Sequence, residues 1–361
     1  LESAEKWTYA VGVKHLFSPK AQILLERRSG DCDQTLLSVP DRLLQQGGWY
    51  IRITLKSLAP CAAPQDSGAS ETDTFINRLE PIKDSTELLD GRVNLSIETA
   101  IAQWTGPRND MKVVMAIYHD IGGHHWVDKI ERWVMDSDEV ERLQPSRRRS
   151  IYQGHPFWAT RVAAIFGVGP TIKVNEVLIG SDKLGHFISQ GKKFYRRYMK
   201  SLDAAKAAEH SAYTERALFG QMTTGSYSNA DLVANYEGFL FYLSLFEDEI
   251  VPGKKAILAW KEDHWVIQRS FTWADHVNEY WDEALNINHY DRLLHHHMEE
   301  RLQTFCGDYF RAPEMYTIEN EEILRERYKH LQLRDTSDLR LDHLCPGNPE
   351  YSISGVAGQS Q

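Results

Sequence analysis

Long apolar runs and an excess of positive charge are both missing from this sequence of 361 residues. The longest apolar candidates, Val113 to Tyr118 and Phe239 to Phe246, are far shorter than the roughly 18–20 residues that cross a bilayer. The formal net charge of -10 disfavours a general nucleic-acid binder, because such proteins normally carry a basic excess. We therefore expect no transmembrane segment and no nucleic-acid partner.

Cysteine is scarce as well, with four residues and no CxxC pair, which disfavours a zinc knuckle and a thioredoxin-like motif. Pairing of sequence neighbours would give the bridges Cys32–Cys61 and Cys306–Cys345, each worth about 3–4 kcal/mol in the chain-entropy model. Such bridges indicate a periplasmic or secreted protein, whereas four buried thiols would fit the cytosol. The chain begins at Leu1 rather than Met, so we expect a processed product or a fragment.

Hydrophobic residues are present in an ordinary share of 42%, and 10 Trp and 16 Tyr are generous for this length, so the chain can bury a sizeable core. We predict an α+β fold that is mainly α, with a small N-terminal antiparallel sheet packed on a larger helical domain. Three regions are expected: a mixed region over 1–120, a helical catalytic domain over 121–305 and a C-terminal extension over 306–361.

Local patterning assigns the individual elements. Trp49 to Leu55 alternates between apolar and polar residues, as a half-buried strand does. The segments Arg92 to Ile97 and Met111 to Tyr118 are also predicted as strands. Helices are predicted over 126–135, 184–199, 204–219, 230–246, 280–302 and 319–331.

The first chemical cluster is the segment DKLGHF, which begins at Asp182. Asp182, His186 and Gln190 recur every fourth residue and therefore share one face of a helix. A carboxylate and an imidazole one turn apart can fix the tautomer of the imidazole or bind a metal together. The alternative is a helix cap followed by a buried, hydrogen-bonded histidine.

The second cluster is a loop that leads into another helix. Its small or aromatic polar side chains are those of Thr223, Thr224, Ser226 and Tyr227. Ser228 is expected to cap the helix, and Asp231, Asn235 and Gly238 follow along one face at spacings of four and three. Buried polar groups need partners, and the polar face of the first cluster is the expected one. Gly238 would let another backbone approach closely.

These two segments together resemble the DKxxHF and DxxxNxxG pattern of VanZ-like and related small envelope proteins of bacteria. The resemblance covers residues 181–187 and 225–238. It departs from that family in one respect, because VanZ-like proteins are membrane-embedded and this chain has no candidate spanning helix. The resemblance implies a bacterial envelope setting but no defined reaction. It singles out Asp182, Lys183, His186, Asp231 and Asn235.

The stretch from Glu215 to Asp231 also resembles lysozyme-like muramidases, in which a Glu at a helix end precedes a loop rich in Gly, Ser and Thr. The resemblance implies glycoside hydrolysis, with Glu215 as general acid and Asp231, sixteen residues later, as the second carboxylate. Ser226 and Ser228 would help position water, and Glu176 is the reserve candidate for the acid. An exposed glutamate at a helix end is the alternative.

The leading hypothesis is therefore an extracytoplasmic envelope hydrolase that cuts the glycan strands of peptidoglycan, either as a housekeeping enzyme or as an antibacterial effector with an immunity or delivery protein as partner. It assigns no metal ligand and no cofactor. The substrate-binding side chains would be those of Asp182, Lys183, His186, Asn235, Thr223, Thr224 and Tyr227.

Two other classes of function stay open. A metal-dependent hydrolase would use either Asp182 with His186 or a histidine-rich loop formed by His119, Asp120, His124 and His125, for which a polar turn is the alternative. The triplet from His295 to His297, near Asp291, favours a solvated helix face, because three successive residues cannot face one way on a helix. The last class is an envelope binding protein with no catalytic activity.

Overall fold

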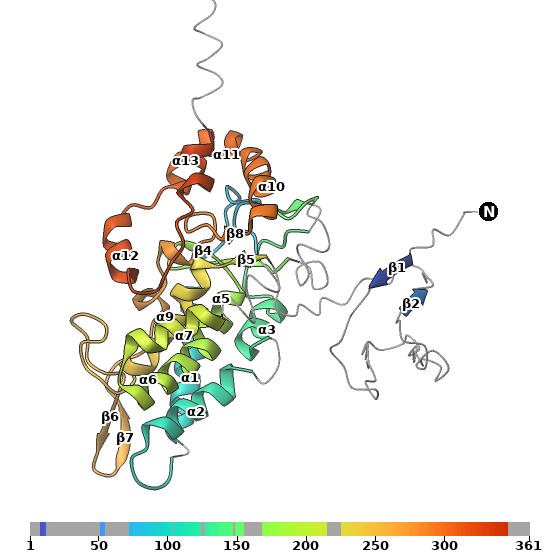
Figure 1. Cartoon of the computed structure of the whole chain (residues 1–361). Helices are drawn as coiled ribbons and strands as arrows, with labels where there is room; N and C mark the ends of the chain where they lie inside the picture. Colours follow the sequence, from blue (N-terminus) through green and yellow to red (C-terminus); the bar gives the residue numbers. More distant parts are fainter. Residues whose placement is uncertain are drawn as a thin grey trace, which may run out of the picture. The chain divides into compact units, whose positions relative to one another are not determined.

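A computed structural model of the chain describes residues 8–11, 51–54, 72–102, 104–123, 127–146, 149–154, 168–214 and 225–345. The chain divides into two compact units, residues 1–66 and 67–361. The boundaries expected at 120 and 305 both fall inside the second unit. Figure 1 shows the chain coloured along its sequence.

The described residues of the first unit form an antiparallel pair of strands. Strand β1 (Thr8–Val11) pairs with β2 (Ile51–Thr54), and Thr8 lies opposite Thr54. The strand predicted from the alternation between Trp49 and Leu55 is thus confirmed over its central four residues.

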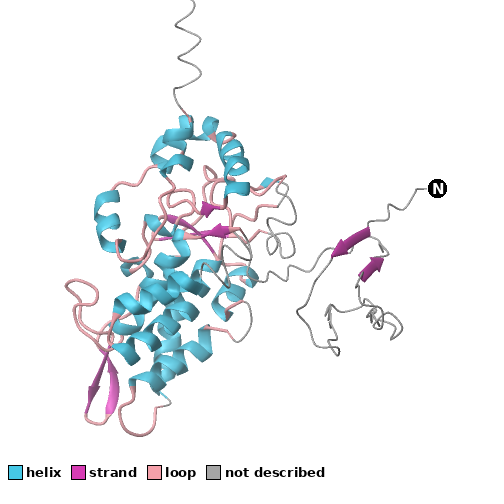
Figure 2. Cartoon of the chain, viewed as in Figure 1, coloured by secondary structure: helices cyan, strands magenta, loops and turns pink. Residues whose placement is uncertain are grey.

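The second unit is mainly helical, and its sheets are two-stranded and antiparallel, which confirms the predicted fold class (Figure 2). Its α-helices are α1 (Thr86–Ala102), α2 (Asp110–Ile121), α3 (Lys129–Asp136), α5 (Asp182–Gly185), α6 (Gly191–Ser201), α7 (Ala204–Thr214), α9 (Asn229–Ser244), α10 (Arg292–Gln303), α11 (Cys306–Arg311), α12 (Glu321–Tyr328) and α13 (Leu341–Leu344). The π-helical turn η3 (His186–Gln190) and the 3-10 turns η5 (Trp273–Asp275), η6 (Glu279–Trp281), η7 (Pro313–Tyr316) and η8 (Ser337–Leu339) accompany them. The strands are β3 (Thr171–Val174), β4 (Val177–Gly180), β5 (Ser226–Tyr227), β6 (Leu258–Lys261), β7 (His264–Ile267) and β8 (His289–Tyr290), paired as β3–β4, β5–β8 and β6–β7. Over the described ranges, no helix has both the length and the apolar character needed to cross a membrane.

Two predicted strands are wrong. Residues 92–97 lie in α1 and residues 111–118 in α2, and the two helices pack together. Buried side chains of α1, such as Val93 and Ile97, are spaced by three or four residues. Over so short a segment, the apolar pattern is compatible with a helix and with a strand. Asn109 decides the matter locally, since its side chain accepts a hydrogen bond from the Lys112 N–H and caps α2.

The helix predicted over 280–302 is only partly correct. The structure has η6, then strand β8, and then α10 from Arg292 onward. His289 and Tyr290 pair with the much earlier strand β5, His289 with Tyr227 and Tyr290 with Ser226. Because Asp291 then caps α10 through a hydrogen bond from the Leu294 N–H, the chain starts a new helix there.

The core that positions the site lies where η3 and α6 cross α9. A Cβ atom added at Gly238 would lie 1.9 Å from the carbonyl oxygen of Phe187, and one added at Gly191 would lie 2.6 Å from the Cα atom of Gly238. Such distances leave room for no side chain, so the expected close approach at Gly238 is confirmed. Around the crossing, the rings of Phe187 and Trp273 are fully buried with their centroids 4.6 Å apart.

A second, smaller core joins α10, α11 and α13, which gather at one end of the unit (Figure 1). The disulfide Cys306–Cys345 links α11 to the end of α13, as the spacing of the cysteines predicted. The other predicted bridge, Cys32–Cys61, lies outside the described residues.

Candidate functional site

The candidate site begins where the β3–β4 hairpin leads into a helical segment. Helix α5 starts at Asp182, and the π-helical turn η3 follows directly from His186. A π turn costs hydrogen-bond quality and is found often at functional sites. On the facing side α9 starts after Ser228, whose hydroxyl accepts a hydrogen bond from the Asp231 N–H at 3.1 Å and confirms the predicted cap.

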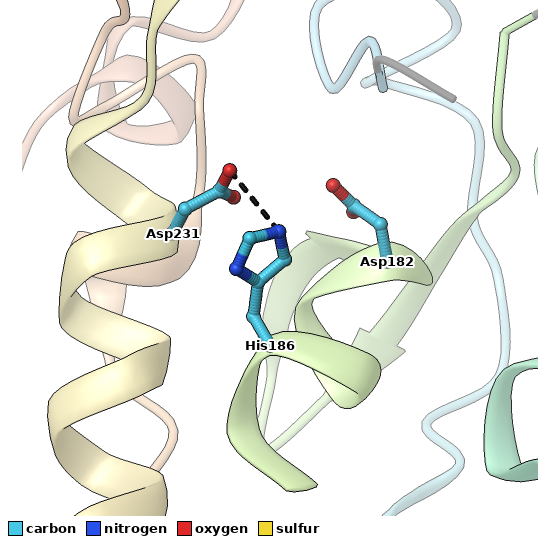
Figure 3. A group of neighbouring side chains, drawn as sticks. All are labelled: Asp182, His186 and Asp231. Carbon is cyan, nitrogen blue, oxygen red and sulfur yellow. Dashed lines mark ion pairs between the residues drawn. The ribbon is translucent and has the colours of Figure 1, made fainter. Parts of the chain in front are cut away.

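Asp182, His186 and Asp231 converge between these two helices, as Figure 3 shows. His186 Nε2 lies 3.2 Å from Asp231 Oδ2, and His186 Nδ1 lies 3.0 Å from the side-chain oxygen of Asn235. One ligand atom from each of the three residues lies within 4.8 Å of the other two. The structure thus brings together the two polar faces, as the sequence predicted.

Lys183 is fully buried behind these residues, and its ammonium touches three carboxylates. Its Nζ atom lies 2.9 Å from Asp182 Oδ2, 2.7 Å from Asp231 Oδ1 and 2.6 Å from Glu283 Oε1. Glu283 also accepts a hydrogen bond from the hydroxyl of Thr72 at 2.9 Å. Neither Glu283 nor Thr72 stands in a motif, so nothing in the sequence marks them as members of the site.

The charges of this cluster do not balance. Burial raises the pKa of Asp182 to about 6, and the charges of Asp231 and Glu283 add to that effect against the pull of Lys183. Burial also acts to raise the pKa of Asp231, but the charges of His186 and Lys183 outweigh it and hold that pKa below its ordinary value. The three carboxylates therefore outnumber the two groups that can be positive, Lys183 and His186, in a region that excludes most water, which favours a further positive charge.

Two atoms of the cluster are available to a further positive charge, Asp182 Oδ1 and His186 Nε2. Asp182 Oδ1 is buried and has no hydrogen-bond partner among the described residues, although a buried acceptor without one is costly. The side-chain oxygen of Asn235 can only accept, so Nδ1 of His186 carries the proton. In that tautomer Nε2 offers its lone pair to a cation. The residues present therefore fit a metal ion.

A second acidic layer lies beside the first. The Ser189 hydroxyl donates to Asp128 Oδ1 at 2.8 Å, and burial raises the pKa of Asp128 to about 6. Burial and the neighbouring Asp128 raise the pKa of Glu131 well above its ordinary value. A Cβ atom at Gly185 would lie 1.7 Å from Glu131 Oε1, so this layer packs directly against α5.

The other residues predicted for the site fall into three groups. Ser226 and Tyr227 are buried in β5, and the Tyr227 hydroxyl donates to the carbonyl oxygen of Gln332 at 3.2 Å. Glu176 lies in the exposed β3–β4 turn, 78% exposed and paired with Lys173, and it does not join the buried cluster. Residues Glu215, Thr223 and Thr224 lie outside the described residues.

The predicted histidine clusters are placed as follows. Asp120 forms an ion pair with Arg92 on the neighbouring helix α1, and His124 and His125 lie outside the described residues. His296 is 77% exposed and pairs only with glutamates of its own helix, as a solvated face requires. Within the part of the chain that the structure describes, the Asp182–His186–Asp231 triad is the one group of three acidic, His or Cys side chains arranged to hold a metal ion.

Comparison with known proteins gives no guide to identity, since no family model, no curated protein and no solved structure matches the chain. The resemblances to VanZ-like proteins and to muramidases therefore stay predictions, and the site has to be interpreted from its own chemistry.

Proposed function

We propose that this protein is a metal-dependent hydrolase whose cation is held by Asp182, His186 and Asp231. The convergence of three ligand atoms within 4.8 Å carries the proposal. Three protein ligands leave coordination positions for water and substrate, which is the arrangement of catalytic rather than structural metal sites. A bound divalent cation supplies a more acidic water and polarises an oxygen of the substrate.

The ligand set favours certain metals. Two carboxylates and one imidazole suit Zn²⁺, Mn²⁺ or Fe²⁺ better than Ca²⁺, which prefers a shell of oxygens alone. The absence of cysteine from the triad disfavours soft ions such as Cu(I).

The residues around the triad have positioning roles in this proposal. Lys183 holds one oxygen of Asp182 and one of Asp231, which leaves the other oxygen of each carboxylate for the cation. Asn235 accepts the Nδ1 proton of His186 and keeps Nε2 directed toward Asp231. Partners of this kind fix ring orientation and typically contribute 10–100-fold to metal affinity.

The substrate class that we propose is a polymer of the bacterial envelope, with peptidoglycan first. The Cys306–Cys345 disulfide supports a periplasmic or secreted location, because disulfides persist mainly in oxidising compartments. The DKLGHF segment supports the same setting through its resemblance to envelope proteins.

The test combines metal binding with product analysis. The full chain is stripped with a chelator, titrated with Zn²⁺ and Mn²⁺ by calorimetry, and incubated with purified peptidoglycan whose fragments are identified by mass. We expect His186→Ala to weaken metal binding at least 100-fold and to abolish fragment release. His296→Ala, a histidine 77% exposed on α10, is the matched control and should change neither. A wild-type chain that binds neither metal would refute the proposal.

A metal-independent glycosidase is the second candidate, favoured by one observation. The pKa of Asp182 is raised to about 6 while that of Asp231 is lowered, and a split of this kind separates a general acid from an ionised carboxylate. In that case cleavage of glycan strands survives the chelator and is lost in Asp182→Asn. Loss in Glu215→Gln instead would assign the acid to the residue predicted from the sequence. If the chelator by itself abolishes cleavage by the wild-type chain, the metal-dependent reaction is favoured instead.

A further inference from the structure

The ammonium of Lys183 lies at the centre of a group of carboxylate oxygens. Its Nζ atom lies 2.9 Å from Asp182 Oδ2, 2.7 Å from Asp231 Oδ1 and 2.6 Å from Glu283 Oε1, and the side chain is 0% exposed. These distances exceed the roughly 2.3–2.6 Å between Ca²⁺ and its oxygen ligands by only a few tenths of an ångström. The ammonium thus holds a position that a hard divalent cation would suit.

Two of these carboxylates also belong to the metal triad. In Figure 3 the carboxylates of Asp182 and Asp231 face the His186 ring from two sides. Asp231 Oδ2 lies 3.2 Å from His186 Nε2, and Asp182 Oδ1 has no hydrogen-bond partner within the described part of the chain. Each carboxylate therefore has one oxygen on Lys183 and the other toward the triad. A cation at the triad and the ammonium would share both carboxylates, as the two ions of a dinuclear centre do.

Glu283 serves the ammonium and not the triad. Its Oε1 atom contacts Lys183 and accepts a hydrogen bond from the Ser228 hydroxyl at 3.3 Å, and its Oε2 atom accepts one from the Thr72 hydroxyl at 2.9 Å. Both oxygens have protein partners, and Glu283 is not among the residues whose ligand atoms converge at the triad. Because this carboxylate is only 3% exposed, it acts as a buried counter-ion of Lys183.

The charges of the cluster match one divalent cation. Asp182, Asp231 and Glu283 contribute three negative charges and Lys183 contributes one positive charge, while His186 is neutral when it binds a metal. One divalent cation brings the total to zero. A second one would leave an excess of positive charge in a region that excludes most water, where unbalanced charge is costly.

We propose that Lys183 fills the second cation position of this centre, so that the wild-type chain binds one divalent metal ion at the triad and no second ion beside it. This inference rests on the proposed metal-dependent hydrolase and defines its centre as mononuclear. It also assigns a latent metal site, formed by the three oxygens around Nζ, that opens when the ammonium is removed. Because these ligands are all oxygens, the latent site should prefer Mn²⁺ or Ca²⁺ to Zn²⁺.

The experiment counts the Mn²⁺ ions bound per full-length chain by equilibrium dialysis, with Zn²⁺ in a parallel series. We expect one Mn²⁺ in the wild type and two in Lys183→Ala. The double variant Lys183→Ala, Glu283→Gln should return to one, because Glu283 supplies a ligand to the latent site alone. Lys173→Ala is the matched control, since it removes the partner of an exposed glutamate, and it should bind one ion.

The outcomes separate this inference from the proposed function. A wild-type chain that binds neither Mn²⁺ nor Zn²⁺ refutes both. A wild-type chain that binds two ions, or a folded Lys183→Ala that binds no more than one, refutes the role of Lys183 and leaves the hydrolase standing.

A second variant decides the question if Lys183→Ala does not fold. Glu283→Gln keeps the ammonium and removes only its counter-ion, so we expect Mn²⁺ affinity to fall by less than about tenfold. Asp231→Asn removes a ligand of the triad and should weaken Mn²⁺ binding by about 100-fold or more. Equal losses in the two variants would make Glu283 a ligand of the first cation and overturn the inference.

Discussion

A methyl group added at Gly238 tests whether the crossing of α9 with η3 builds the site. In Gly238→Ala the new Cβ atom would lie 1.9 Å from the carbonyl oxygen of Phe187 and 2.7 Å from its carbonyl carbon. Both are backbone atoms, so the clash is relieved only if the two helical segments move apart. Overpacking of this kind costs about 1–3 kcal/mol, and the gain in helix propensity from Ala, about 1 kcal/mol, offsets part of it. We therefore expect the free energy of unfolding to fall by a net amount of up to about 2 kcal/mol.

The same movement should weaken metal binding. Asp231 and Asn235 are on α9 and His186 is on η3, so separating the helices changes the distances between ligands. A binding site tolerates roughly 0.5 Å of displacement, and we expect metal affinity to fall about 10–100-fold.

Urea denaturation and calorimetric metal titration measure the two effects. Gly91→Ala is the matched control, because Gly91 is in α1 and a Cβ atom there meets nothing within 4 Å. It should stabilise the protein by about 0.5–1 kcal/mol and leave metal affinity unchanged. If Gly238→Ala also keeps wild-type stability and metal affinity, the crossing does not position the ligands and our account of the site is wrong.

Two further predictions concern buried charge. Lys183→Met should lower the free energy of unfolding by about 3–5 kcal/mol, because it leaves three buried carboxylates without their cation. Lys173→Met removes the partner of an exposed glutamate and should change the free energy of unfolding by less than about 1 kcal/mol. Equal effects of the two variants in urea denaturation would contradict this. The pKa of Asp128 is raised from 3.8 to about 6, so between these pH values the native state keeps a proton that the unfolded state has lost, and stability falls as pH rises. Asp128→Asn keeps the acceptor for Ser189 and should gain up to about 3 kcal/mol over wild type between pH 4 and pH 7; parallel pH profiles of the two proteins would show that Asp128 ionises normally.

The sequence determined those features of the site that depend on neighbours along the chain. The spacing of Asp182 and His186 fixes them on one helical face, and Ser228 caps α9 because its hydroxyl reaches the N–H three residues later. The stripe of Asp231, Asn235 and Gly238 follows from helical periodicity alone. Capping and periodicity are local, so they can be predicted from the sequence.

Tertiary structure alone decided which groups complete the site. Glu283 reaches Lys183 across 100 residues of sequence, and Thr72 reaches Glu283 across 211. Their burial follows from packing of distant segments, which leaves no periodic signal around either residue. The same holds for residues 92–97, whose short apolar pattern suits both a strand and a helix until the partner α2 is known. The sequence therefore predicts which helical face carries each ligand, whereas the close approach of two glycine-containing helices brings the three ligands within reach of one cation.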